Sequence, residues 1–345
     1  MISPKGVLSA VQQTAGSVLV VGSGVAGVQA ALDLTELGYR VHLLEKSAAI
    51  GGAMARLDKT FPTNDCSLCI LAPKLVEAGR NPNIEILTNA EVIAVEGRPG
   101  RFSVLVRRKP RYINEEACTG CGQCALYCLK VIGDDYNEHL SLTHAAHIDY
   151  AQAVPTSYHI DPNACLRLNY DTCGLCAAVC QAKAIRFDQQ EEMLNLEVGA
   201  VVLAPGFGRI SKDVLRRYGW GRFDDVLTAF EFERLMCASG PTSGEIVRVS
   251  DRHHPRRIAF LQCIGSRDET CGNNYCSSVC CMYAIKQATM AREHDPEAEI
   301  TLFYMDVRTH GKGFDAARKR AIAENDLRII YARPPSALSM FNFRV

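Results

Sequence analysis

The chain has 345 residues, of which 48% are hydrophobic, and its 38 basic residues balance 38 acidic ones. A chain of this length can bury a large core and is expected to divide into two or three domains. Zero formal net charge does not indicate nucleic-acid binding, and no apolar run is long enough to span a membrane. The first residues, MISPKGVLSAVQQTAG, lack the pattern of a secretory signal. We therefore expect a cytoplasmic protein, in which sixteen cysteines indicate metal binding rather than disulfides.

A nucleotide-binding pattern begins near the N-terminus. The apolar periodicity predicts a strand, a helix and a second strand at residues 17–21, 26–37 and 40–44. Between the first strand and the helix, Gly22, Gly24 and Gly27 follow the spacing G-x-G-x-x-G. The first glycine permits a tight turn, the second lets the backbone approach a pyrophosphate, and the third allows close packing. The free N–H groups at the helix start would bind that anion, so we predict a dinucleotide site.

The residues after the second strand favour FAD over NAD. Glu45 ends that strand, eighteen residues past Gly27, and is placed to accept a hydrogen bond from a ribose hydroxyl. Lys46 follows it, and Gly51 and Gly52 come shortly afterwards, as in many flavoproteins that bind two dinucleotides.

A second nucleotide-contacting turn is predicted much later in the chain. The stretch LEVGAVVLAPGFG indicates a buried strand that ends in a turn from Ala204 to Gly206. This turn resembles one in the same flavoproteins, with Pro205 in place of the usual threonine. The alternative is an ordinary core strand followed by a turn.

Eight cysteines between these two halves indicate an inserted ferredoxin. The first motif, C-x2-C-x2-C-x3-C, consists of Cys118, Cys121, Cys124 and Cys128. The second motif, C-x7-C-x2-C-x3-C, consists of Cys165, Cys173, Cys176 and Cys180. Thiolates at this spacing are typical of two [4Fe–4S] clusters, in which the fourth cysteine of each motif binds the other cluster. Cys128 would then bind the second cluster and Cys180 the first. Zinc is the alternative, but zinc sites usually use paired C-x2-C motifs.

The predicted domains follow from this insertion. We expect the first part of the FAD lobe at residues 15–107 and the ferredoxin-like insertion at 108–187. The second part of the FAD lobe follows at 188–254, and a second nucleotide-type lobe at 255–345. A cluster domain inserted into a flavin domain implies electron transfer between the two. A cluster domain with a purely structural role is the alternative.

The second lobe repeats the strand, loop and helix order but carries cysteines in its loop. RRIAFLQC predicts a strand, SSVCCMYAIKQATMARE a helix and EITLFYMDV a second strand. This is half a Rossmann unit, at the position of the NAD(P) domain in thioredoxin-reductase-like flavoproteins. CIGSRD, however, has one glycine where the nucleotide motif requires three. We therefore predict a degenerate lobe that does not bind NAD in the usual way.

Three stretches resemble the heterodisulfide reductase A-subunit family, across residues 15 to 335: FPTNDCSLCILAPK, the ferredoxin insertion, and FLQCIGSRD with YCSSVCCMYAIKQA. The resemblance implies that an atypical [4Fe–4S] cluster lies beside the flavin, with four ligands at Cys263, Cys276, Cys280 and Cys281. Neighbouring residues on a helix diverge by about 100°, which favours an unusual cluster shape. Buried free cysteines are the alternative, and Cys271 has no assigned role.

The resemblance also implies a role for a lysine on the same helix. Lys286 is the one charged residue within CMYAIKQATMA, and buried charges need partners. We expect it near the redox-active edge of the flavin ring, with Glu233 as its partner. A lysine whose side chain reaches solvent is the alternative. Cys66 and Cys69 form a further C-x2-C, either a redox-active dithiol or a structural pair.

The family also shows where this sequence is shorter. Longer A subunits add an N-terminal cluster domain and a C-terminal ferredoxin, and this chain ends at FNFRV, before the strand that normally closes the flavin site. We expect a second subunit to cover that gap. The compact form resembles the A subunit of the heterodisulfide-reductase-like complexes of sulfur oxidisers, and the quinone-interacting oxidoreductase subunits of sulfate reducers share its motifs.

The predicted fold is an α/β, thioredoxin-reductase-like flavoprotein with a Rossmann-type FAD lobe, a degenerate NAD-type lobe and an inserted two-cluster ferredoxin domain. The predicted function is that of an electron-transfer subunit with FAD and iron–sulfur clusters, forming a homodimer within a heterodisulfide-reductase-like complex of sulfur metabolism. Two alternatives are an independent NAD(P)H-dependent disulfide reductase that uses Cys66 and Cys69, and a scaffold whose clusters only stabilise the fold.

Overall fold

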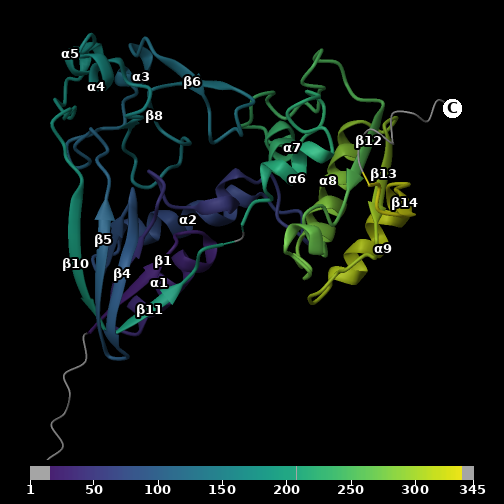
Figure 1. Ribbon diagram of the computed structural model, residues 1–345, viewed down its shortest axis with the longest axis horizontal. Helices are drawn as coiled ribbons and strands as arrows, with labels where there is room; N and C mark the ends of the chain where they lie inside the picture. The colour runs from purple at the N-terminus through teal and green to yellow at the C-terminus, as the bar shows by residue number, and fades with distance from the viewer. Residues whose placement is uncertain (1–15, 207, 336–345) are drawn as a thin grey trace, which may run out of the picture. The chain divides into compact units, whose positions relative to one another are not determined.

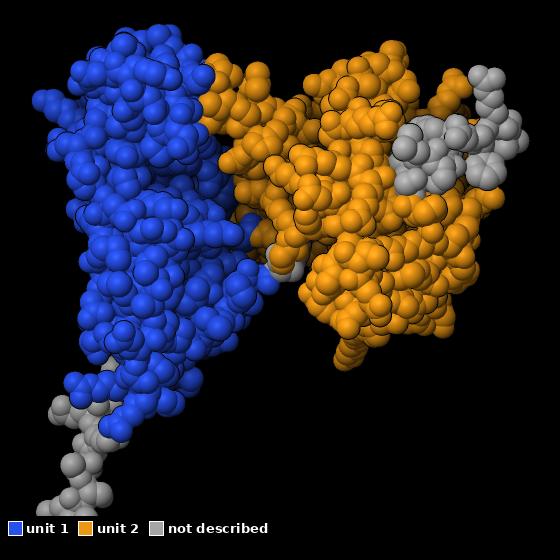
Figure 2. All heavy atoms as spheres, in the orientation of Figure 1, with its two compact units in different colours: residues 1–52, 73–130, 144–206 blue, residues 53–72, 131–143, 207–345 orange. Residues whose placement is uncertain are grey.

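The structure is a computed structural model that describes residues 16–206 and 208–335. The expectations about the N-terminal segment and about the terminal FNFRV lie outside the described residues. The chain forms two compact units, coloured in Figure 2. Unit 1 contains the residues up to Gly52, Pro73–Lys130 and His144–Gly206, and unit 2 contains Ala53–Ala72, Val131–Thr143 and the residues after Gly206. The four-part domain division of the sequence stays a prediction.

A parallel four-stranded sheet carries the nucleotide pattern in unit 1. Its elements are β1 (Ser17–Val21), α1 (Val25–Glu36), β2 (Arg40–Leu44), β3 (Ile84–Leu87) and β11 (Ala200–Leu203), with the strand order β11-β1-β2-β3. The predicted strands at 17–21 and 40–44 are confirmed, and the helix begins and ends one residue earlier than expected. Because β11 pairs with β1, strands from both sides of the cysteine-rich segment complete one Rossmann-type sheet.

An antiparallel sheet packs against the parallel one within unit 1. Its strands are β4 (Ala90–Arg98), β5 (Arg101–Arg108) and β10 (Glu192–Val198), in the order β10-β5-β4. Leu19 and Leu44 of the parallel sheet share a buried core with Val104, Val106 and Val198 of this one. The single strand predicted from Leu196 to the turn at Ala204 is therefore two strands, which belong to different sheets and meet at Gly199.

The cysteine-rich segment forms short elements. They are α3 (Gln123–Leu126), β6 (Val131–Gly133), β7 (Leu142–His144), β8 (Ala146–His147), β9 (His159–Ile160), α4 (Leu166–Tyr170) and α5 (Leu175–Val179). Figure 1 shows α3, α4, α5 and β8 gathered at one end of unit 1. Three buried cysteines, Cys124, Cys165 and Cys176, stand in its small core, where a larger domain would place branched aliphatic side chains.

Unit 2 contains a second parallel sheet, formed by β12 (Arg257–Leu261), β13 (Glu299–Tyr304) and β14 (Arg328–Tyr331) in that order. Its helical elements are α6 (Lys212–Arg217), α7 (Ala229–Met236), η2 (Glu269–Cys271), α8 (Cys280–His294) and α9 (Phe314–Glu324). Figure 1 shows α8 alongside this sheet, and its buried residues form a core with Leu302 and Tyr304 of β13. The predicted order of strand, cysteine loop, helix and strand is confirmed.

Two segments from earlier in the chain complete unit 2. The first includes η1 (Gly52–Arg56) and the start of α2 (Ser67–Arg80), and the division between the units passes through α2 at Pro73. The second holds Tyr136, whose hydroxyl donates a hydrogen bond to the Ala55 carbonyl at 2.6 Å. Within the described ranges, the chain has no helix with the length and apolar character that crossing a membrane requires.

Candidate functional site

The glycine loop after β1 has no room for side chains at two of its three glycines. Gly22 has a φ of +98°, and a Cβ there would lie 2.2 Å from the Ala204 carbonyl oxygen. A Cβ at Gly27 would lie 1.8 Å from the carbonyl oxygen of Gly22. Gly24 differs, because a Cβ at this position would meet no described atom within 4 Å. Gly24 is also the N-cap of α1, which receives no side-chain capping bond, so the loop presents open space and N–H groups to an anion.

Gly51 and Gly52 pack directly against this loop. The Gly51 N–H donates to the Ser23 carbonyl at 2.9 Å, and Gly51 forms a bridge with Gly24. Gly52 has a φ of +58°, and a Cβ on it would approach the Gly24 Cα to 2.8 Å. Gly51 and Gly52 therefore pack against the backbone of the nucleotide loop and support it.

Glu45 has a role that sequence analysis did not predict. It is buried, and its Oε2 accepts hydrogen bonds from the Ser23 N–H at 3.1 Å and the Ser23 hydroxyl at 2.6 Å. Its Oε1 accepts from the Ser47 N–H at 3.0 Å. Glu45 thus holds the glycine loop in place, and a carboxylate has further lone pairs for a ribose hydroxyl. The neighbouring Lys46 is exposed.

The turn from Ala204 to Gly206 lies beside the same loop. The Ala204 N–H donates to the Val21 carbonyl at 2.8 Å, which continues the pairing of β11 with β1. Gly206 has a φ of +72°, which the turn requires. Both turns therefore meet at the carboxyl end of a parallel sheet, the usual position of a nucleotide. The open space at Gly24 and the free helix start fit the pyrophosphate of FAD.

Cysteines from both ferredoxin-type motifs line one pocket in unit 1. Cys128 comes from the first motif, and the second motif supplies the other three, Cys165, Cys173 and Cys176. This is the set that the spacing predicted for the second cluster. Burial, and then the nearby Cys165, raise the pKa of Cys176 to about 11.

The remaining ferredoxin-type cysteines lie around Cys124. Burial, and then Cys118, raise the pKa of Cys124 to about 12, and Cys121 contributes a smaller effect. Cys180 packs against the same core and accepts a hydrogen bond from the Ala184 N–H at 3.3 Å. Ionising several neighbouring buried thiols is costly without a cation, so this donor set suits iron, which stabilises the thiolates.

The cysteine loop after β12 brings three thiols together at the start of α8. Cys280 is hydrogen-bonded to Cys263 and to Cys281, and these bonds lower the pKa of Cys280 and raise the pKa values of its two partners. Cys263 and Cys281 therefore both lie next to Cys280. Cys276 is half-buried, and its sulfur accepts a hydrogen bond from the Ser278 N–H at 3.3 Å. Cys271 lies further back on the loop in η2.

Lys286 forms a buried ion pair with Glu233 in unit 2. The two residues are 4% and 1% exposed, so the alternative in which Lys286 reaches solvent is wrong. Lys286 also donates to the Lys59 carbonyl at 2.9 Å. Glu233 accepts from Gln287 Nε2 at 2.8 Å and from the Asp58 N–H at 2.9 Å, so both charges have polar partners. Burial, and then Glu233, raise the pKa of Asp58.

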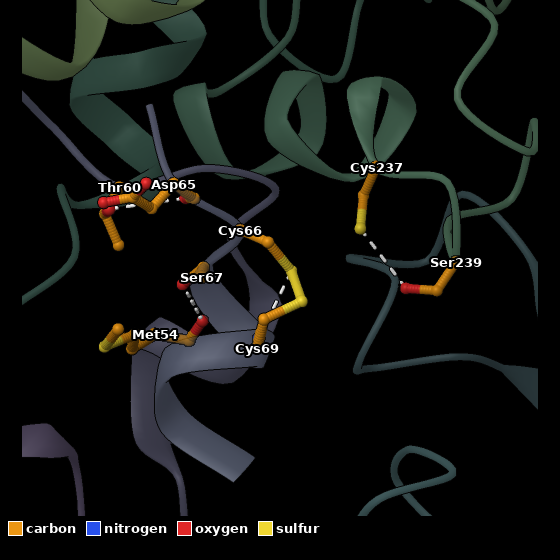
Figure 3. The surroundings of a disulfide bond; sticks show 8 residues. All are labelled: Met54, Thr60, Asp65, Cys66, Ser67, Cys69, Cys237 and Ser239. Atoms are coloured by element: carbon orange, nitrogen blue, oxygen red, sulfur yellow. Dashed lines mark hydrogen bonds between the residues drawn. A yellow bond between two sulfur atoms is a disulfide. The ribbon is translucent and has the colours of Figure 1, made fainter. Parts of the chain in front are cut away.

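Cys66 and Cys69 form a disulfide at the start of α2, as Figure 3 shows. The Cys69 N–H donates to the Cys66 sulfur at 3.2 Å. The sequence left a redox-active dithiol or a structural pair open here, and the general expectation of metal binding rather than disulfides is wrong for this pair. Helix α2 continues through Pro73. Figure 3 also shows Cys237, which no cysteine motif had indicated, with its sulfur 3.2 Å from the Ser239 hydroxyl.

Comparisons with known proteins agree with this geometry. Residues 20–84 match the model of an NAD(P)-binding Rossmann-like domain. The chain is 50% identical, over 92% of its length, to an A-type iron–sulfur subunit of the CoB–CoM heterodisulfide reductase of Methanopyrus kandleri. It is 45% identical, again over 92% of its length, to the corresponding iron–sulfur subunit of Methanocaldococcus jannaschii. These alignments cover 47% and 48% of the two relatives, so the chain spans about half the length of the curated relatives it matches.

Among solved structures, the thioredoxin reductase of Lactococcus lactis aligns with 91% of this chain and 64% of its own, at 11% identity and a TM-score of 0.40. The two parallel sheets and the Rossmann-like match confirm the predicted α/β nucleotide-binding fold. The resemblance to the heterodisulfide reductase A subunits is confirmed as homology over nine-tenths of the chain.

Proposed function

We propose that this chain, a homologue of heterodisulfide reductase A subunits, is the electron-transferring flavin and iron–sulfur subunit of a heterodisulfide-reductase-like complex in sulfur metabolism. It is an oxidoreductase component that works in the cytoplasm, as a homodimer joined to other subunits. It holds FAD at the glycine loop, two ferredoxin-type [4Fe–4S] clusters in the inserted segment, and an atypical cluster in the loop after β12.

The observation that carries this proposal is the pocket lined by Cys128 together with three cysteines of the second motif, Cys165, Cys173 and Cys176. Crossing of the fourth cysteine between motifs is typical of two-cluster ferredoxins and is not needed for zinc. A flavin exchanges electrons in pairs or singly, and [4Fe–4S] clusters pass them one at a time. An electron-transfer role follows from having both kinds of site on one chain.

The residues of the chain have distinct roles in this account. The loop amides near Gly24 bind the pyrophosphate, and Glu45 fixes the loop. The ferredoxin-type thiolates hold iron. Cys263, Cys276, Cys280 and Cys281 hold the atypical cluster, and the fixed charge of Lys286 stabilises electron density on the reduced flavin, as homology to the A subunits suggests.

The experiment that tests the proposal is an anaerobic titration of the purified, cofactor-loaded chain. We expect dithionite to reduce both flavin and clusters, and NADH to leave the flavin oxidised, because the loop after β12 begins with CIGSRD, which has one glycine where the nucleotide motif requires three. Isolation of the complex from its native host would then identify the partners. Stoichiometric reduction of the flavin by NADH would contradict the proposal.

A second candidate function is an NAD(P)H-dependent disulfide reductase that uses Cys66 and Cys69. The observation that favours it is their position at the start of α2, where the helix dipole stabilises a thiolate. This function predicts that NADPH or NADH makes two further thiols available to alkylation, located at Cys66 and Cys69 by peptide mass spectrometry. If neither cofactor exposes these thiols, the second candidate is excluded.

A further inference from the structure

Two histidines and an aspartate lie together in the inserted segment of unit 1, apart from the cysteine motifs. His147 ends β8, and His159 begins β9. The two strands are antiparallel, with His147 directly opposite His159. Asp149 follows His147 by two residues, in the bend after β8. Three possible metal ligands therefore converge from two segments.

Their distances suit a single metal ion. One ligand atom from each residue lies within 4.8 Å of the other two. His159 Nε2 is 3.7 Å from Asp149 Oδ1, and the two imidazole centroids are 4.1 Å apart. Tetrahedral zinc with bonds of about 2.1 Å separates its ligand atoms by about 3.4 Å. Small side-chain rotations of these residues would therefore close a three-ligand site.

Both imidazoles also have buried nitrogens without hydrogen bonds. Nδ1 of His147 and Nδ1 of His159 are enclosed, and neither has a hydrogen-bond partner among the residues that the structure describes. An unmet buried polar group costs about 1–3 kcal/mol, and each imidazole therefore still has a ring nitrogen that can accept a further bond.

The β8–β9 pair separates this cluster from the cysteine pocket. Ala146 and Ile160, each adjacent in sequence to one of the histidines, line the pocket that contains the ferredoxin-type cysteines. Because side chains alternate along a strand, His147 and His159 lie on the opposite face of the pair. The three residues are therefore not alternative ligands for the iron–sulfur clusters.

We propose that His147, Asp149 and His159 bind one divalent transition-metal ion, with zinc as the expected occupant. Two imidazoles and one carboxylate are typical three-residue zinc ligands, with water in the fourth position. Magnesium and calcium prefer oxygen ligands alone, and iron–sulfur clusters need thiolates. The proposal is independent of the electron-transfer function, because it uses none of the flavin or cluster residues.

The test measures zinc uptake by the full chain with its iron–sulfur clusters loaded. Chelator-treated protein is dialysed anaerobically against buffered zinc, and bound zinc and iron are both counted. We expect one zinc per chain at this site, with nitrogen and oxygen neighbours in X-ray absorption at the zinc edge. Wild-type protein that takes up no zinc, or zinc with only sulfur neighbours, would overturn the proposal.

Three variants locate the site. His147→Gln and Asp149→Asn should each weaken zinc binding by at least about tenfold, since even the loss of a residue that only supports a ligand has such an effect. His144→Gln is the matched control, because His144 on β7 also has a buried Nδ1 without a partner among the described residues but lies outside the three-residue cluster. It should bind zinc like the wild type.

The iron count shows whether each variant has kept its fold. If His147→Gln loses iron, Asp149→Asn decides the question, because the Asp149 side chain is 23% exposed and its replacement is nearly isosteric. Equal zinc affinity in the wild type and in an iron-loaded Asp149→Asn variant would exclude the site.

Discussion

Two loops occupy equivalent positions in the two parallel sheets and differ in what they present. The loop after β1 leads into α1 with glycines, and the loop after β12 leads into α8 with cysteines. Neither helix start receives a side-chain capping bond. If the loop after β12 holds the proposed cluster, one strand–loop–helix arrangement serves two kinds of cofactor. A short loop with exposed amides suits a phosphate, and a long loop with thiols suits a metal cluster.

The helices that follow the two loops differ in the polarity of their buried residues. The buried residues of α1 are Gly27, Val28, Ala31 and Leu32, all of them apolar or glycine. Helix α8 buries Lys286 and Gln287 as well. In unit 1 the helix after the glycine loop therefore buries no polar side chain, whereas in unit 2 the helix after the cysteine loop does.

The largest expected effect comes from the glycine loop. Gly27→Val places a side chain against a backbone oxygen that a Cβ would approach to 1.8 Å, so we expect a loss of more than about 3 kcal/mol in the free energy of unfolding. Gly24→Val enters open space and should cost less than about 1 kcal/mol, yet it should abolish FAD binding. Denaturant unfolding and the flavin content of the purified proteins measure the two effects.

This pair of variants separates folding from binding within one loop. A Gly24→Val protein that retained stoichiometric FAD would show that the cofactor does not occupy this loop. A Gly27→Val protein as stable as the wild type would show that the close approach of α1 to the loop is not required.

The buried charge on α8 gives the next effect. Lys286→Met leaves the Glu233 carboxylate buried without its cation, and breaking such a pair costs about 3–5 kcal/mol. The double variant Lys286→Met/Glu233→Gln should recover most of this loss in thermal or denaturant unfolding. The flavin midpoint potential should fall in Lys286→Met, because reduced flavin loses a stabilising positive charge, and it should fall less in the double variant, which also removes the negative charge of Glu233. An unchanged potential would place Lys286 away from the flavin and leave it a structural role.

The smallest effect compares a glycine from each loop. Gly265 in the cysteine loop has a φ of +66°, and a Cβ there would meet the Cγ2 methyl group of the Ile210 side chain at 2.8 Å. Gly265→Ala should therefore cost about 1–2 kcal/mol, the usual penalty of a left-handed backbone. Gly22→Ala should cost more, because its Cβ would meet the backbone oxygen of Ala204. If Gly265→Ala and Gly22→Ala lost the same free energy of unfolding in chemical denaturation, the two glycines would not differ in how closely their surroundings pack.

The elements around the glycine loop could be predicted because their sequence is locally consistent. An apolar run, a glycine motif and an amphipathic helix all indicate one structure, and β1 and β2 have the predicted bounds. The partition of the chain into two units could not be predicted, because η1 and the start of α2 join unit 2 through contacts with distant residues. The hydrogen bond from Tyr136 to Ala55 is one of these contacts, and no local pattern encodes it.

The candidate sites also divide into those that a local sequence pattern predicts and those that depend on contacts between distant residues. Cysteine spacing grouped Cys128 with the second motif, as the pocket later did. The His147, Asp149 and His159 cluster was missed, because its strands have two residues each and its members are brought together by pairing across a long loop. The pattern H-x-D was the available sign. The role of Cys66 and Cys69 was left open between a redox-active dithiol and a structural pair, because the C-x2-C spacing fits both.

The iron content of the Cys276→Ser protein tests the central claim most directly, because Cys276 lies in the cysteine loop and in neither ferredoxin motif. Anaerobically purified wild-type protein should contain roughly twelve irons per chain, about four for each cluster, and one FAD. Cys276→Ser should lower the iron content by about a third and keep the FAD. Cys271→Ser, in the same loop, is the matched control and should keep both. If Cys276→Ser leaves the iron count unchanged, the loop after β12 does not hold a cluster.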